Sequence, residues 1–200
     1  MSEFLTYVTL GFRHITDVNG ADHILFLLVL AAIYRFRDVR AVLAVVTAFT
    51  VGHSLTLGLA VTGWLRLPQA IVEFLIPVTI VLTAVENMAS REPASGSWRM
   101  RSRPIFAGVF GLVHGAGFAN YLQSLFVEHI AVPLFGFNVG IELGQVVVLV
   151  LAFSAFALLD LIIDWGQMWW RASALRVRTV LVSAVVAIVA TRWAVERLPW

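Results

Sequence analysis

The sequence predicts an all-α polytopic membrane protein, a bundle of six to seven transmembrane helices with a short or re-entrant N-terminal helix. Two observations predict this class. The 200 residues are 60% hydrophobic and only 13% charged, whereas about a quarter of the residues in a typical soluble domain are charged. The apolar residues also recur in runs of about 20, the length of helix that crosses a bilayer core. We therefore expect residues 1–200 to form a single transmembrane domain.

Six candidate spans follow a short N-terminal segment, residues 1–20. Each is a mainly apolar run bounded by basic or turn-rich residues. The spans are residues 21–34, 39–62, 67–90, 104–121, 133–159 and 175–195.

The arginines predict the orientation of these spans. They cluster at 35–40, 91–103 and 171–178, so alternate loops are basic, as is typical of loops that face the cytoplasm. Arg192 and Arg197, at the other end of the last span, depart from this pattern. Because the basic residues follow span ends, they indicate membrane topology rather than binding to nucleic acid.

The first span is too short to cross the bilayer. Its 14 residues rise only about 21 Å as a helix. If its inner end is fixed at Arg35, then Asp22 and His23 at its start lie below the outer surface, at membrane depth. Non-helical backbone at that depth must be surrounded by protein or by a water-filled cavity. We therefore expect residues 1–20 to cover this start as a short or re-entrant helix that ends in a polar turn.

Three later spans carry ionisable residues at a similar depth. His53 lies about 13 Å, His114 about 10 Å and Glu142 about 13 Å from the outer ends of their spans, from the helical rise per residue. Ionisable groups inside a membrane are costly and indicate a functional site by default. Together with Asp22 and His23, they predict one site in the outer half of the bilayer.

Polar neighbours are predicted to orient these ligands. Asn138 and Gln145 share a helical stripe with Glu142, because they lie four residues before it and three residues after it. Thr50 lies three residues before His53, near the same helix face. We assign Asn138, Gln145 and Thr50 to a supporting shell around the site.

Glycines repeat every fourth residue on the two spans that carry His114 and Glu142. Such ridges of small residues let two helix backbones approach closely. We expect the two ridges to pack together and to bring His114 and Glu142 to a shared ion. The ridge glycines are Gly111, Gly115, Gly136, Gly140 and Gly144.

The types of ligand restrict the metal. The chain has no cysteine, which excludes thiolate zinc sites and iron–sulfur clusters. Imidazole combined with carboxylate favours nickel, cobalt or zinc over magnesium or calcium. A divalent transition metal, as substrate or as bound ion, would also offset the cost of burying Asp22 and Glu142.

Four segments of the chain carry a resemblance to a known family. They are GFRHITDVNGADHILFLL (11–28), TAFTVGHSLTL (47–57), FGLVHGAGFANYL (110–122) and LFGFNVGIELGQ (134–145). In these segments the chain resembles the HupE/UreJ family of membrane proteins, which are similar to nickel or cobalt permeases and are named as accessory to nickel hydrogenases and urease.

The resemblance implies a set of metal-binding positions and a location. The implied positions are His14, Asp22, His23, His53, His114 and Glu142. It also implies uptake of nickel or a similar ion across a bacterial cell inner membrane by a multi-pass protein. A second copy of the chain or metalloenzyme maturation proteins would be its protein partners.

Three functions fit these observations. The first is a permease for a divalent transition-metal ion, with nickel or cobalt favoured, and in that case the protein is not an enzyme. The alternative is an intramembrane zinc-dependent hydrolase that acts on a lipid-like amide or ester, with Glu142 or Asp22 as general base. The third is a metal sensor or membrane scaffold. Structural roles also stay open: Asp22 as a helix N-cap, His53 as a packing residue, and His114 with Glu142 as a hydrogen-bonded pair.

Overall fold

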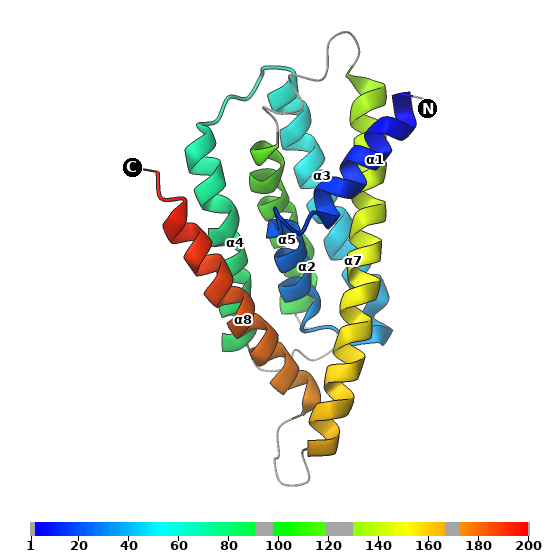
Figure 1. Cartoon of the computed structure of the whole chain (residues 1–200), viewed down its shortest axis with the longest axis vertical. Helices are drawn as coiled ribbons and strands as arrows, with labels where there is room; N and C mark the ends of the chain where they lie inside the picture. The colour runs from blue at the N-terminus through cyan, green and yellow to red at the C-terminus, as the bar shows by residue number, and fades with distance from the viewer. Residues whose placement is uncertain (1–2, 91–97, 119–129, 167–172, 200) are drawn as a thin grey trace.

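The computed structural model describes residues 3–90, 98–118, 130–166 and 173–199 (Figure 1). Within these ranges every regular element is helical and there is no strand, which confirms the predicted all-α class. The elements are α1 (Glu3–Thr16), α2 (Asp22–Ala31), the short 3-10 helix η1 (Phe36–Asp38), α3 (Val39–Val61), α4 (Gln69–Ala89), α5 (Trp98–Gly117), α7 (Ala131–Gly166) and α8 (Ala174–Glu196).

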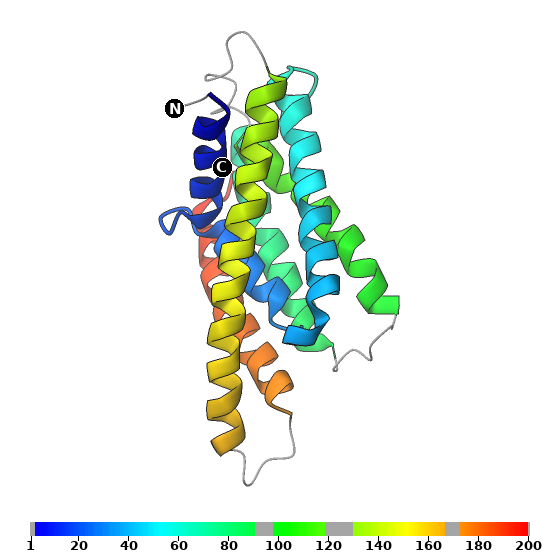
Figure 2. The same cartoon turned by 90° about the vertical axis from the view of Figure 1, so that its right-hand side faces the viewer.

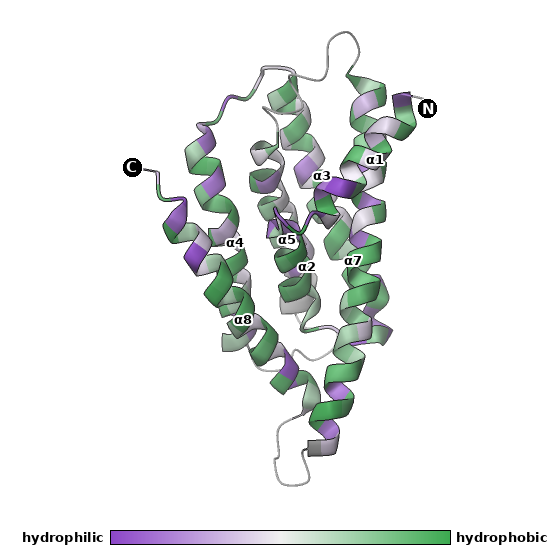
Figure 3. Cartoon of the chain, viewed as in Figure 1, coloured by the Kyte–Doolittle hydropathy of each residue, from purple (hydrophilic) through white to green (hydrophobic). Residues whose placement is uncertain are grey.

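The outer surface of the bundle is apolar, as expected of a membrane protein. Four helical stretches in the described part of the chain are long and apolar enough to cross a membrane: Phe36–Val61, Gln69–Ala89, Ala131–Trp165 and Ala174–Glu196. Large apolar side chains point outward from them, such as Leu55, which is 55% exposed. Figure 3 shows hydrophobic residues along the whole length of these helices. In water this surface would be unfavourable, whereas lipid tails cover it without cost.

Three pairs of closely packed helices surround a central helix. α1 packs against α7, α3 against α5 and α4 against α8, while α2 contacts α4, α7 and α8. After its first two residues, α2 (DHILFLLVLA) is apolar on every side. A helix that is apolar all round is typical of a protein core or a membrane, and α2 lies in the middle of the bundle with most of its residues buried (Figure 1).

The glycine ridges allow close packing, but not with each other. A methyl group at Gly140 of α7 would meet the backbone of α1, and one at Gly115 of α5 would meet the backbone of α3. The prediction that the two ridges pack together was therefore wrong. A ridge of small residues specifies a close approach without specifying its partner. Gly11 on α1 and Gly52 on α3 complete the two interfaces from the other side.

α1 and α2 behave as two halves of one broken span. α1 lies along the first part of α7, and α2 continues from mid-height toward the far end of the bundle (Figures 1 and 2). This confirms the short N-terminal helix. The turn between the halves is held by Asp17, whose Oδ1 accepts a hydrogen bond from the backbone N–H of Asn19 at 2.9 Å. Broken helices at membrane depth are a common way to build ion sites, because helix ends present unpaired backbone groups.

α7 is longer than its predicted span. It covers Ala131–Gly166, 36 residues, where the sequence predicted 133–159, and it rises about 54 Å. This exceeds a bilayer core of roughly 30 Å. The extension carries Asp160 and Asp164 and projects beyond the neighbouring helices (Figure 1). The helix therefore continues past both carboxylates.

One end of the bundle carries two buried arginines, Arg103 and Arg178, and the half-buried Arg176, and we name it the arginine end after these three residues. Arg178 of α8 is 3% exposed and pairs with Asp160 of α7. It also donates hydrogen bonds to the carbonyl oxygens of Ala32, at 3.3 Å, and of Tyr34, at 2.7 Å. These carbonyls follow the last turn of α2, where no further helix turn bonds them. Arg178 therefore caps the central helix.

A second arginine ties α4 and α5 together at the same end. Arg103 is 7% exposed, lies 3.4 Å from the carboxylate of Glu86 and donates to Oδ1 of Asn87 at 2.8 Å. Asn87 in turn donates to the carbonyl of Val29 in α2 at 2.6 Å. The network therefore links α5, α4 and α2 at this end of the bundle.

Candidate metal centre

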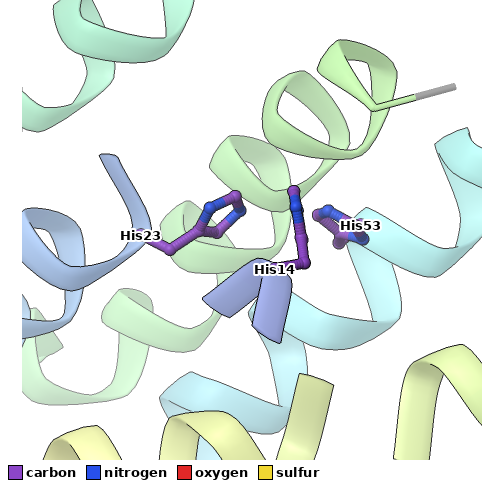
Figure 4. Close-up of side chains that lie close together, drawn as sticks. All are labelled: His14, His23 and His53. Atoms are coloured by element: carbon purple, nitrogen blue, oxygen red, sulfur yellow. The ribbon is translucent and has the colours of Figure 1, made fainter. Parts of the chain in front are cut away.

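Three histidines from three different helices converge where the α1–α2 span is broken. His14 comes from the last turns of α1, His23 from the first turn of α2, and His53 from α3. One ring nitrogen of each can be chosen so that all three lie within 4.8 Å of one another. Figure 4 shows the three side chains gathered together, and their ring centroids form a triangle with sides of 4.6, 5.9 and 5.8 Å. We call them the three-histidine group.

The spacing of the group fits a metal ion after a small adjustment. Metal–imidazole nitrogen bonds are about 2.0–2.1 Å long, so nitrogens around one ion are about 3–4 Å apart. The present upper limit of 4.8 Å is a little wider. Small rotations of the imidazole rings would bring the nitrogens closer together.

Several ring nitrogens of the three-histidine group are buried and lack hydrogen-bond partners, which favours the binding of a ligand. His53 is 0% and His23 is 6% exposed. Both ring nitrogens of His53 and Nε2 of His14 and of His23 are buried without a hydrogen-bond partner. A buried polar atom without a partner costs about 1–3 kcal/mol. Several such atoms aimed at one point are costly unless an ion or an ordered water molecule completes them.

His114 of α5 adjoins the group and is held in one tautomer. Its ring centroid lies 5.3 Å from that of His23, and its Nε2 lies 3.0 Å from Oγ1 of Thr79. Thr79 gives its single proton to the carbonyl of Ile76 at 2.7 Å, so Nε2 of His114 must be the donor to Thr79. Nδ1 then keeps its lone pair, and it is buried without a partner. A histidine that binds a metal through one ring nitrogen typically donates the N–H of its other ring nitrogen to a supporting acceptor.

Aromatic rings wall the histidines. Phe118 lies 4.1 Å from His14 between ring centroids, and Phe137 lies 5.6 Å from it. Phe49 lies 5.2 Å from His114, and Phe26 lies 5.3 Å from His114. These walls exclude water from one side, and the low local dielectric strengthens any interaction between the ring nitrogens and a cation.

The two predicted carboxylates are placed differently from the histidines. Asp22 does not cap α2, because no side chain makes a capping hydrogen bond there. It pairs instead with Arg197, which lies 3.1 Å away. Glu142 of α7 is half-buried, and among the described residues it does not join the three-histidine group. The glycine ridge of α7 packs against α1 rather than against α5, the helix that carries His114.

The predicted supporting residues join α7 to α3 beside His53. Thr50 donates to Oε1 of Gln145 at 2.9 Å, and Ser54 donates to Oδ1 of Asn138 at 2.6 Å. Thr50 and Ser54 flank His53 in sequence. The stripe on α7 therefore fixes the helix that carries His53.

A cavity of about 340 Å³ leads to the histidines from the end of the bundle opposite the arginine end. The ligands that it reaches are His14, His23 and His114, and its polar rim carries Asp17, Asp22, Gln69, Glu73 and Arg197. Three carboxylates on this rim attract cations. The cavity gives an ion from solution access to the buried nitrogens of these histidines.

Sequence reasoning missed several of these residues. Thr79 was not considered, although a hydroxyl two residues after a proline within an apolar helix is a signal for a local polar contact. Glu73 was also not considered, because a carboxylate near the start of a predicted span can reach water. Arg197 was noted only for breaking the charge pattern of the loops, and the structure supplies the reason for its position in its contact with Asp22.

One comparison with known proteins gives a match that covers almost the whole chain. A family model described as HupE / UreJ protein matches residues 1–197. Searches among curated proteins and among solved structures found no match.

Proposed function

The chain belongs to the HupE/UreJ family, and from this premise we propose that it is a permease for a divalent transition-metal ion, nickel or cobalt. The observation that carries the proposal is the convergence of His14, His23 and His53 with unpartnered ring nitrogens inside an apolar bundle. Neutral imidazoles select nickel, cobalt, copper and zinc over magnesium and calcium, which prefer oxygen ligands.

The geometry supports a route that begins at the open cavity. If the arginine end faces the cytoplasm, as the positive-inside rule predicts, the cavity opens to the outside and the structure is an outward-open state. A hydrated dication would first meet the carboxylates on the rim. It would then exchange water for the ring nitrogens and stay bound to the histidines until the arginine end opens. The negative end of the α1 helix dipole also favours a cation beside His14.

Release to the inside requires the arginine end to open. Arg103 with Glu86 and Asn87 is the barrier below the central helix. The α4–α8 pair is held to the rest of the bundle through α2, α5 and α7, so its movement as a unit would have to break the contact of Arg178 with Asp160. Movement of one helix group against another around a central site is the common mechanism of secondary transporters.

Flux across a sealed membrane tests the proposal. We expect proteoliposomes that contain the full chain and an entrapped metal-sensitive dye to take up Ni(II) or Co(II) and to exclude Mg(II). His23→Ala should abolish uptake, because it removes a ligand at the bottom of the cavity. Ile188→Ala is the matched control, since Ile188 is 71% exposed on the outer face of α8. Equal uptake by liposomes with wild-type protein and without protein would reject the permease.

The zinc hydrolase stays a second candidate because of one observation. Three histidines beside an open cavity match the catalytic zinc pattern of three protein ligands with a free fourth position for water. Asp22 beside His23 would then serve as the general base. A permease releases its ion during turnover, whereas a hydrolase retains one zinc per chain through gel filtration and cleaves a lipid-like amide or ester. Measurement of retained zinc and of cleavage separates the two.

A further inference from the structure

We propose that Arg197 is a tethered cation that competes with the metal ion for Asp22 and so sets the affinity of the cavity mouth. The inference rests on the proposed metal-binding function of the cavity and adds a residue from the far end of the chain to it. Two observations carry it: the contact that Arg197 makes with Asp22, and the unpartnered histidine nitrogens in the same cavity.

The contact itself is specific and lies at the cavity. One guanidinium nitrogen of Arg197, Nη1, donates to both carboxylate oxygens of Asp22, at 3.1 and 3.2 Å. The two side chains are 30% and 15% exposed. Both line the cavity that reaches His23 and His114. The carboxylate adjacent to a candidate ligand is therefore occupied by a positive charge that belongs to the protein.

Electrostatics make this arrangement exchangeable. A dication that enters the cavity repels the guanidinium, while both are attracted by the same carboxylate. The guanidinium can be solvated when it leaves Asp22, because its side chain is already 30% exposed. The guanidinium also contacts Trp193 in the same conformation, with its Cζ 5.4 Å from the ring centroid, and this contact does not require Asp22.

The arginine end provides the contrast. Arg178 is 3% exposed and is held by two carbonyl oxygens and Asp160. Removal of that guanidinium would leave buried acceptors without partners, so it is fixed. Arg197 has the opposite properties, since it is 30% exposed, lies at a helix end and lines a cavity. Its carboxylate partner can be solvated or can bind another cation when the arginine leaves.

Equilibrium binding of Ni(II) to the purified full chain tests the inference. We expect Arg197→Gln to bind Ni(II) about three- to tenfold more tightly than wild type, because the competing charge is gone. Arg197→Lys, which keeps the charge, should stay close to wild type. Arg192→Gln is the matched control, because Arg192 is exposed on the same helix and pairs with Glu196 at 2.7 Å. Unchanged or weaker binding by Arg197→Gln would overturn the inference.

A spin label gives a second measurement that does not need a charge variant. The chain has no cysteine, so a label can be attached at Leu198→Cys alone, next to Arg197. We expect its mobility to rise when Zn(II), which is diamagnetic, saturates the protein. A label at Val185→Cys, on the exposed face of α8, should not respond. An immobile label at 198 with and without Zn(II) would contradict the exchange.

The failure of this inference can be told from the failure of the proposed function. If Arg197→Gln tightens Ni(II) binding but wild-type liposomes show no flux, the competition stands and the permease does not. If wild type transports Ni(II) and Arg197→Gln leaves its binding unchanged, the permease stands and the competition is rejected. Absence of Ni(II) binding to both proteins would reject both.

Discussion

Replacement of His53 with alanine is expected to lower the affinity for Ni(II) by about 100-fold or more and to abolish transport. Loss of residues that only support a metal ligand costs about 10–100-fold, and His53 supplies a nitrogen of the three-histidine group itself. His53 is fully buried with both ring nitrogens unpartnered, so its removal takes away the ligand without breaking a hydrogen bond. Calorimetric titration of the detergent-purified protein measures the change.

Val51→Ala is the control for this variant. Val51 lies two residues earlier on α3 and is 62% exposed, so it faces lipid. It should bind Ni(II) as wild type does. If His53→Ala also binds as wild type does, the three-histidine group is only a packing feature and the proposed route is wrong. If His53→Ala raises the thermal midpoint of unfolding while binding is lost, the cost of the unpartnered nitrogens is confirmed as well.

Gly52→Ala is expected to force α3 and α5 apart and to destabilise the bundle. A Cβ at this position would collide with the carbonyl oxygen of Gly108 on α5. Backbone atoms cannot turn aside as a side chain can, so α3 and α5 must separate. Overpacking of this kind costs about 1–3 kcal/mol or more. Because His53 and His114 sit on these two helices, metal binding should also weaken.

Gly58→Ala provides the matched control on the same helix. There the added methyl group would lie 3.5 Å from the Cδ2 atom of Leu134, which is an ordinary contact. We expect Gly58→Ala to keep the wild-type thermal midpoint and Ni(II) affinity, and Gly52→Ala to lose several degrees of stability. Equal midpoints for the two variants would show that α3 and α5 are not packed as closely as the structure has them.

Much of the fold follows from the sequence because the bilayer imposes simple rules. Apolar runs of fixed length predicted the helices, and the short first span predicted that Asp22 and His23 begin a helix at mid-height behind a short N-terminal helix. These predictions need only the rise of a helix and the thickness of a membrane. The histidines could be assigned a common depth for the same reason.

The lateral arrangement of the helices could not be predicted in this way. The sequence gives the height of Glu142 but not which helix it faces, since its glycine ridge can receive any helix with a small-residue partner. Gly11 on α1 fills that role, and Glu142 is not among the residues that form the three-histidine group. Contacts between distant parts of the chain, such as Arg197 with Asp22, have no local signal at all. His14 was implied by family resemblance, and its place beside His23 depends on the turn between α1 and α2.

X-ray absorption at the nickel edge of the Ni(II)-loaded protein tests the central claim most directly. The account predicts multiple-scattering features of at least three imidazoles at about 2.0–2.1 Å from the metal, reduced by one imidazole in His14→Ala. A first shell of oxygen atoms alone, or a spectrum that His14→Ala, His23→Ala and His53→Ala all leave unchanged, would contradict it.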